Sequence, residues 1–159
     1  MWLPRQVCKL LMDPAVAGIE FRAVANSNDS WALRVAAQEG HADVCKLLMD
    51  PDVAGIEFRA RANSRDSRSL WAAAKAGHAD VCKLLVDPAV AGLEFRALPN
   101  SRDSWALWEA AKAGHADVCK LLMDPEVAGI EFRARANSSN SWAYCVRLQR
   151  KGTQMSDCF

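Results

Sequence analysis

The sequence predicts an all-α solenoid of stacked helix-turn-helix units joined by long hairpin-like loops. The first observation is a repeat: the nonapeptide Gly-His-Ala-Asp-Val-Cys-Lys-Leu-Leu begins at Gly40, Gly77 and Gly114, at intervals of 37 residues. Two helical apolar patterns and one alternating segment recur within each copy. Tandem self-similarity with a period of about 20–50 residues is typical of solenoids. We therefore expect residues shared by all copies to build the scaffold, and residues that differ to carry the function.

The first helix of a unit is predicted over residues 104–113. Either Asp103 or Ser104 is the expected N-cap, and Gly114 fits the position just past the C-terminus, where the backbone turns left-handed. Apolar side chains at i, i+3 and i+4 give this helix one face for burial, formed by Leu107, Ala110 and Ala111.

The second helix follows directly, from His115 to about Met123. Asp117 in its first turn suits the positive end of the helix dipole. Asp124 ends the helix because a residue that precedes proline avoids the helical conformation. The apolar face of this helix consists of Val118, Cys119, Leu121 and Leu122.

A loop completes each unit. Residues 130–135 alternate apolar and charged side chains, which predicts an extended arm of a hairpin or a long loop. Within such a segment Glu57 and Arg59 share one face, and stacked copies would form a solvated ladder of alternating charge. A unit of this kind cannot bury its apolar faces without a neighbour.

With Asp29 as the start, the chain divides into three full copies, residues 29–65, 66–102 and 103–139. Residues 1–28 form a partial N-terminal copy, with the second helix and loop only, and residues 140–152 form a partial C-terminal copy. We expect residues 153–159 to be a disordered tail. Terminal units normally cap a stack with a polar face, so two incomplete units predict fraying, or end-to-end self-association through apolar ends.

Composition narrows the class of protein. The net charge of +1 is too balanced for a protein whose main partner is a large polyanion, and an apolar fraction of 51% suffices for a core. We expect no membrane span and no signal peptide. Four of the six cysteines share one repeat position and cannot all pair, which predicts reduced core thiols: Cys8, Cys45, Cys82 and Cys119. We therefore expect a cytoplasmic protein, and the same features fit the nucleus.

The pattern Leu-x-x-Ala-Ala-x-x-Gly-His-x-x-Val-x-x-Leu-Leu, followed by a glycine-containing loop, resembles the ankyrin repeat over roughly residues 4–144. Ankyrin repeats usually have 33 residues, and we place most of the four extra residues of each copy at 51–54 and its equivalents. The family's Thr-Pro-Leu-His signature keeps only its leucine, at Leu33, Leu70 and Leu107. We expect tryptophan packing to replace the usual hydrogen bonds between units.

Residues with catalytic or metal-binding chemistry recur in every copy. His41 and Cys45 lie four apart on one helix, but zinc normally needs four ligands, and helices packed about 8–10 Å apart keep successive pairs from sharing one ion. We therefore expect no metal. Ser, His and Asp also recur, yet similar copies along a rod supply no single preorganised pocket. We predict no enzyme and no cofactor.

The resemblance implies that loop tips and the exposed sides of the first helices bind another protein, so we predict a protein–protein interaction scaffold. For Trp71 and Trp108 we favour packing between units. Two alternatives stay open: binding of nucleic acid through loop arginines such as Arg61 and Arg135, which the loop glutamates disfavour, and a fragment of a longer array without independent activity. The predicted contact residues differ between copies or have side chains common in binding hot spots: Gln38, Glu39, Ser64, Arg65, Ser67, Lys75, Ser101, Arg102, Ser104, Lys112, Ser138, Ser139, Trp31 and Trp105.

Overall fold

The computed structural model describes Met12 and residues 24–135, and this part of the chain contains helices but no strands. Three units of three helices follow one another. They are α3 (Ser27–Gln38), α4 (Ala42–Met49) and α5 (Pro51–Ala54); α6 (Ser64–Ala76), α7 (Ala79–Val86) and α8 (Pro88–Ala91); and α9 (Ser101–Ala113), α10 (Ala116–Met123) and α11 (Pro125–Ala128). The predicted all-α solenoid is confirmed.

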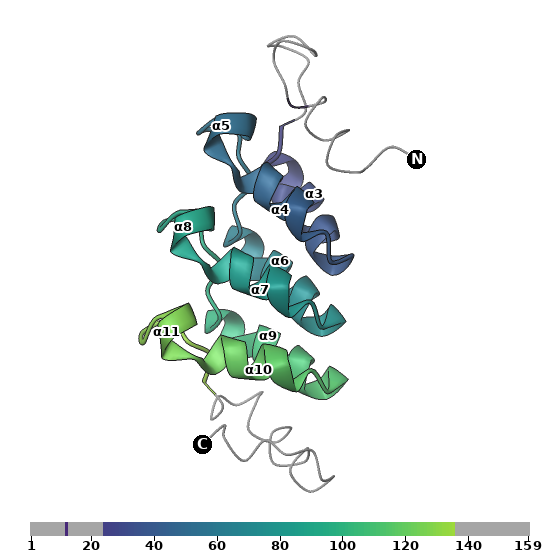
Figure 1. The fold of residues 1–159 in the computed structure, drawn as a ribbon, viewed down its shortest axis with the longest axis vertical. Coiled ribbons are helices and arrows are strands. Elements are labelled where there is room, and N and C mark those ends of the chain that lie inside the picture. Colours follow the sequence, from purple (N-terminus) through teal and green to yellow (C-terminus); the bar gives the residue numbers. More distant parts are fainter. Residues whose placement is uncertain (1–11, 13–23, 136–159) are drawn as a thin grey trace, which may run out of the picture.

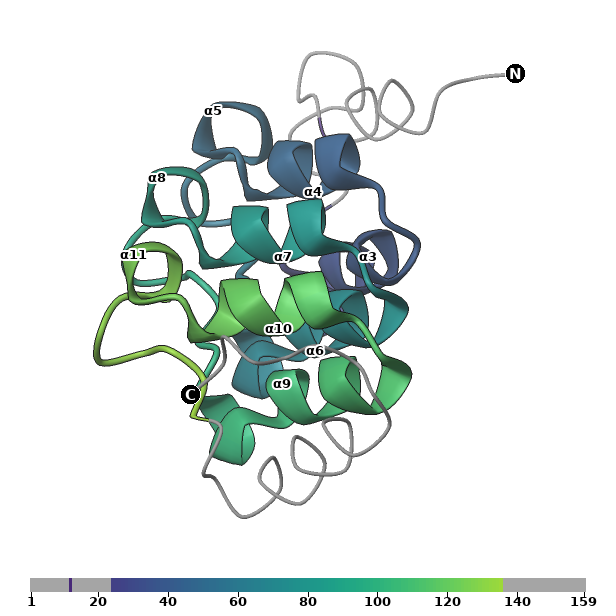
Figure 2. The same ribbon diagram turned by 60° about the horizontal axis from the view of Figure 1, so that its bottom comes forward.

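The units stack along one axis (Figure 1). The first helices α3, α6 and α9 form one layer, and the second helices α4, α7 and α10 form the layer in front of it (Figures 1 and 2). Along the stack α6 packs between α3 and α9, and α7 packs between α4 and α10. The short helices α5, α8 and α11 line one edge. Each unit thus buries its apolar faces against its neighbours.

The buried faces of both helices consist of the residues that the periodicity predicts. Leu107, Ala110 and Ala111 are fully buried in α9, and small alanines let neighbouring helices approach closely. In α10 the side chains of Val118, Cys119 and Leu122 are buried, and Leu121 packs partly buried against the same core. Each fully buried leucine or valine stabilises the stack by about 1.5–3 kcal/mol relative to an exposed one.

The extra residues of each copy fold as the third, short helix. Pro51 begins α5, where its missing N–H is not needed, and the carboxylate of Asp50 accepts a hydrogen bond of 2.9 Å from the N–H of Asp52. Gly55 then ends α5 with a φ of 83°. The segment in which we placed most of the extra residues, 51–54, is therefore structured.

The prediction of an extended loop arm is wrong. In the first loop the N–H groups of Phe58 and Arg59 both donate to the carbonyl oxygen of Gly55, at 3.1 and 3.0 Å, which makes a tight turn. The guanidinium of Arg59 lies 4.7 Å from the ring centroid of Phe95 in the next loop, whereas Glu57 is exposed. The loops therefore stack through cation–π contacts and not through the predicted ladder of charge.

The predicted copy boundaries after residues 65 and 102 lie inside α6 and α9, so a structural unit starts a few residues earlier with the same period. Residues 1–11, 13–23 and 136–159 lie outside the described part. With them lie nearly all of the partial N-terminal copy, the whole partial C-terminal copy and tail, and the predicted contact residues Ser138 and Ser139.

Candidate functional site

Each first helix begins with three residues in the left-handed conformation. In α6 these are Arg65, Asp66 and Ser67, with φ of 45°, 58° and 61°, and the equivalent residues of α3 and α9 have φ between 48° and 61°. A left-handed residue other than glycine costs about 1–2 kcal/mol. Both expected N-cap residues, Asp103 and Ser104, lie in this turn, and the hydroxyl oxygen of Ser104 accepts its hydrogen bond from the N–H of Arg135 in the next loop.

Serine side chains hold these turns against the neighbouring loops. The hydroxyl oxygen of Ser67 accepts a hydrogen bond of 2.9 Å from the N–H of Leu98. Ser104 accepts one of the same length from Arg135, and Ser30 one from Arg61. Ser67 and Ser104 are buried. The hydroxyl groups of these two serines therefore serve the scaffold and are not offered to a partner as predicted, although Ser67 also lines the hollow described below.

The turns aim two predicted contact arginines at the preceding unit. Arg65 pairs with Asp29, and the Nε of Arg102 lies 3.0 Å from the Oδ2 of Asp66. All four side chains are well exposed. Exposed ion pairs contribute about 0–1 kcal/mol. These pairs therefore orient the guanidinium groups on the surface more than they stabilise the stack.

Tryptophans and cations gather on the first-helix layer. Trp31 is 52% exposed and Trp105 is 38% exposed, as predicted for accessible aromatics. The guanidinium of Arg34 lies 3.9 Å from the ring centroid of Trp31. The ammonium groups of Lys75 and Lys112 lie over the half-buried rings of Trp71 and Trp108, at 5.3 and 4.7 Å. Cations over aromatic faces give this layer a basic, aromatic surface.

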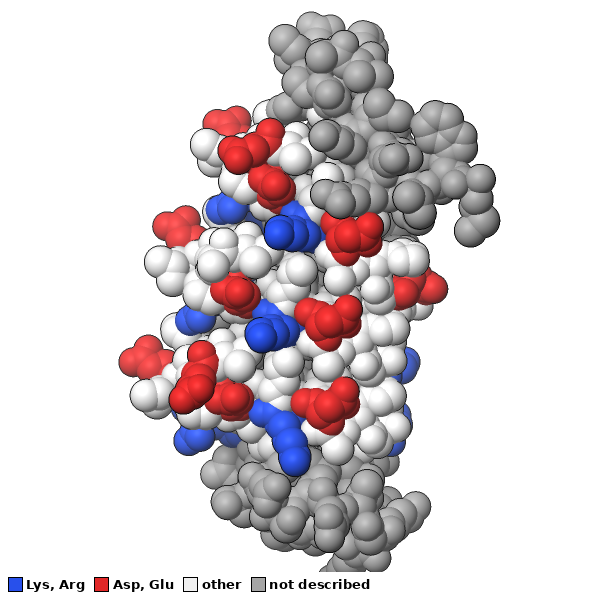
Figure 3. Space-filling view, in the orientation of Figure 1, with Lys and Arg blue, Asp and Glu red and all other residues white. Residues whose placement is uncertain are grey.

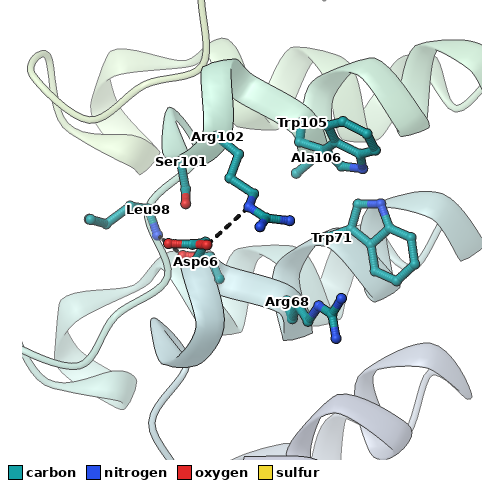
Figure 4. Close-up of a pocket in the computed structure, with 9 residues that line it drawn as sticks. Asp66, Arg68, Trp71, Leu98, Ser101, Arg102, Trp105 and Ala106 are labelled. Atoms are coloured by element: carbon teal, nitrogen blue, oxygen red, sulfur yellow. Dashed lines mark hydrogen bonds and ion pairs between the residues drawn. The ribbon is translucent and has the colours of Figure 1, made fainter. Parts of the chain in front are cut away.

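A hollow of about 100 Å³ lies between α6 and α9 on this layer. Figure 4 shows Arg102 reaching toward Asp66, with Trp71 and Trp105 in the neighbouring part of the wall. The Nε1–H of Trp71 is buried without an acceptor among the described residues. The predicted contact residues in the wall are Ser67, Ser101, Arg102 and Trp105, and the full lining is Asp66, Ser67, Arg68, Trp71, Leu98, Ser101, Arg102, Trp105 and Ala106. The other lining residues, Asp66, Arg68, Trp71, Leu98 and Ala106, were not among the predicted contact residues, because only stacking of α6 on α9 brings them together.

The other predicted contact residues lie at the two ends of the first helices. Gln38, Glu39, Lys75 and Lys112 are exposed near the C-terminal ends of α3, α6 and α9. Ser64, like Ser101, is half-buried at the start of its helix. The surface thus runs from the left-handed turns, past the tryptophans, to the lysines.

The histidines and cysteines of the repeat serve the scaffold. The Nε2 of His115 donates to the carbonyl oxygen of Lys75 at 3.2 Å. Cys45, Cys82 and Cys119 are buried thiols outside any disulfide, and burial, together with nearby Asp80, raises the pKa of Cys82 to about 12. In the described residues no three His, Cys, Asp or Glu side chains lie close enough to hold a metal ion.

Comparison with known protein families decides the family. The model that describes three copies of ankyrin repeats matches residues 36–136, well over half of the chain. The chain belongs to the ankyrin repeat family. No curated protein and no solved structure matches the chain. Ankyrin repeats are in general protein–protein interaction modules.

These ankyrin units keep hydrogen bonds between them despite the missing Thr-Pro-Leu-His signature. The side-chain amide of Asn63 donates to the carbonyl oxygen of Glu94 at 2.7 Å, and its backbone N–H donates to the carbonyl oxygen of Phe95 at 3.0 Å. Hydrogen bonds of Asn63 and Ser67 thus join successive units, so the expectation that tryptophan packing takes the place of such bonds is corrected. No helix of the described ankyrin units is long and apolar enough to cross a membrane.

Proposed function

We propose that this ankyrin array binds a protein partner through the first-helix layer, with the hollow between α6 and α9 at the centre. The partner presents an acidic segment with one apolar side chain. Its apolar side chain enters the hollow beside Trp71 and Trp105, and its carboxylates meet the cations around it. The observation that carries the proposal is the hollow itself, which combines two tryptophans with an exposed arginine. Buried aromatic and arginine side chains dominate binding energy at protein interfaces.

Charge supports an acidic partner. Exposed Arg68 lines the hollow, and exposed Lys75 and Lys112 follow it along α6 and α9. Asp66 is the one carboxylate in the described wall, and it is already paired with Arg102. A carboxylate of the partner would replace Asp66 as the ion-pair partner of Arg102, or would pair with Lys75. Breaking the exposed Arg102–Asp66 pair costs little free energy.

Nucleic acid is the less supported partner. The guanidinium groups of Arg59 and Arg61 lie over the Phe95 ring of the next loop, and Arg65 pairs with Asp29. Figure 3 shows acidic and basic groups interspersed over the second-helix face of the molecule. Phosphate binding needs free cations that displace counterions. The buried, reduced thiols also support a reducing compartment such as the cytoplasm. The proposed role is binding without catalysis.

Affinity capture tests the proposal. The wild type and a Trp105→Ala/Lys75→Glu variant are used as bait in cell extract, each with and without nuclease, and folding is checked by circular dichroism. We expect a protein bound by the wild type to survive nuclease and to be lost with the variant. A Lys46→Glu/Lys83→Glu bait, altered on α4 and α7, is the control and retains it. Loss of all bound proteins on nuclease treatment would contradict the proposal.

A further inference from the structure

The loops expose an aliphatic side chain at the same position in all three described units. Ile56 is 77% exposed, Leu93 is 78% exposed and Ile130 is 79% exposed. We call these three residues the tip row. Each follows the glycine that ends a short helix, along the edge formed by α5, α8 and α11 (Figure 1). Such exposure of a large aliphatic side chain contributes nothing to the stability of the stack.

The backbone under the tip row is held in place. The carbonyl oxygen of Gly92 accepts hydrogen bonds from the N–H groups of Phe95 and Arg96, at 3.2 and 3.0 Å. The carbonyl oxygen of Glu94, next to Leu93, accepts a hydrogen bond of 2.7 Å from the side chain of Asn63 in the preceding loop. Binding of a partner would therefore cost little conformational entropy, because the turns are already ordered.

Acidic groups surround the tip row. Glu57, Glu94 and Glu131 directly follow its three residues and are exposed. Asp52 and Glu126 add exposed carboxylates on α5 and α11. Two nearby arginines are turned aside, since Arg59 lies over Phe95 and Arg96 lies over Phe132, whereas Arg133 at the equivalent position of the third unit is exposed. Figure 3 shows red groups recurring along the edge where the short helices lie. A partner with basic flanks matches this edge.

The spacing of the row selects the conformation of the partner. Packed helices, and hence successive units, lie about 8–10 Å apart. Seven residues of an α-helix rise about 10.5 Å and return to the same face. Three residues of a β-strand also span about 10 Å, but the third points to the opposite face. A polyproline II segment has a repeat of about 9 Å, but it docks in aromatic-lined grooves, and Arg59 covers the Phe95 ring here.

We propose that the tip row is a second protein-binding surface, which takes an amphipathic helix with basic flanks lying along the stack. Aliphatic residues of the helix at intervals of seven contact Ile56, Leu93 and Ile130 in turn, and its lysines or arginines meet Glu57, Glu94 and Glu131. This surface lies on the loops and shares no residue with the hollow between α6 and α9, so the two binding sites can be tested separately.

A designed peptide tests the tip row. The probe is a fluorescein-labelled 22-residue helix with leucine at the first and fourth positions of each heptad and lysine beside them. Its controls are a shuffled peptide, a version with glutamate for lysine, and a proline-rich peptide with leucine at every third position. Binding to the full chain is measured by fluorescence anisotropy. We expect at least a tenfold weaker affinity for Ile56→Asn/Leu93→Asn/Ile130→Asn, whose side chains are too exposed to affect folding.

Variants elsewhere separate the two surfaces. Val35→Asn replaces a partly exposed aliphatic residue on α3 and keeps the affinity, and Trp105→Ala at the hollow keeps it as well. Leu93→Asn alone is expected to weaken binding more than Ile56→Asn, because Leu93 lies at the centre. Unchanged binding by the triple variant overturns the proposal. Equal binding of the shuffled or glutamate peptide, or tighter binding of the proline-rich peptide, overturns it too.

Discussion

The imidazole of His78 joins its unit to the preceding one at Gly40. Its Nε2 donates to the carbonyl oxygen of Gln38 at 3.1 Å, and a Cβ on Gly40 would lie only 2.7 Å from the Cε1 of the ring. His115 fits against Gly77 in the same way. The glycine and the histidine of the repeated nonapeptide thus form a contact between units, in which the histidine ring of one unit packs against the glycine of the preceding unit.

Alanine substitutions at two equivalent glycines should distinguish the effect of this glycine–histidine contact on stability from the effect of backbone strain. Gly77 and Gly114 both end their first helices with left-handed φ, of 84° and 87°. A Cβ on Gly77 would lie 2.5 Å from His115, whereas no described atom lies within 4 Å of one on Gly114. We expect Gly114→Ala to lower the free energy of unfolding by about 1–2 kcal/mol, and Gly77→Ala to lower it by about 1–2 kcal/mol more, because the ring must give up its hydrogen bond. Urea denaturation measures the free energy of unfolding of both variants. Equal losses would contradict a stabilising contact between Gly77 and His115.

The buried serines should matter more for stability than serines nearby that are only half-buried. Ser67→Ala leaves the N–H of Leu98 without its acceptor, and we expect a loss of about 1–3 kcal/mol in the free energy of unfolding. Ser64→Ala lies three residues away in the same helix and is half-buried, and we expect it to change stability by less than about 0.5 kcal/mol. Urea denaturation of the two variants compares them, and a similar effect at both positions would show that the left-handed turn does not depend on this bond.

The core thiols should be unreactive until the array unfolds. Burial, with Asp43 and Asp80, raises the pKa of Cys45 from 9.0 to about 12, and burial also raises that of Cys82 to about 12. In a variant with Cys8, Cys145 and Cys158 changed to serine, a disulfide reagent at pH 8 should label the remaining thiols only in urea. Rapid labelling of the folded protein would contradict this burial.

The same pKa shifts predict a loss of stability in alkali. A pKa that is raised on folding stabilises the folded state fully below the unfolded value of 9.0, and this contribution is lost as the pH rises toward about 12. We therefore expect the free energy of unfolding of that same variant to be insensitive to these thiols up to about pH 8.5 and to fall above pH 9. Cys82→Ala in this background should weaken the fall, as urea denaturation across this range would show.

Much of the fold follows from local patterns in the sequence. Leu107, Ala110 and Ala111 mark a buried helical face because their spacing matches the helical period, and all three are buried. Asp124 before Pro125 ends α10 because proline restricts the residue that precedes it. The 37-residue period alone predicts that such faces are covered by neighbouring units.

The loops and turns were harder to predict. The alternation in residues 130–135 resembles a strand, but Gly129 allows a turn whose own hydrogen bonds satisfy the backbone. The left-handed turn at Arg65, Asp66 and Ser67 has no local signal, since none of the three is glycine. The hydrogen bond that the N–H of Leu98 in the following loop donates to Ser67 helps to hold it in place.

The candidate surfaces show the same division. The sequence by itself determined the period, the helices and the buried faces, because these depend on residue spacing along one chain segment. Only the tertiary structure decided that Ser67 and Ser104 are buried, that Arg102 pairs with Asp66, and that Trp71 and Trp105 line one hollow. Those relationships join side chains about one repeat apart in sequence, and stacking alone brings such residues into contact.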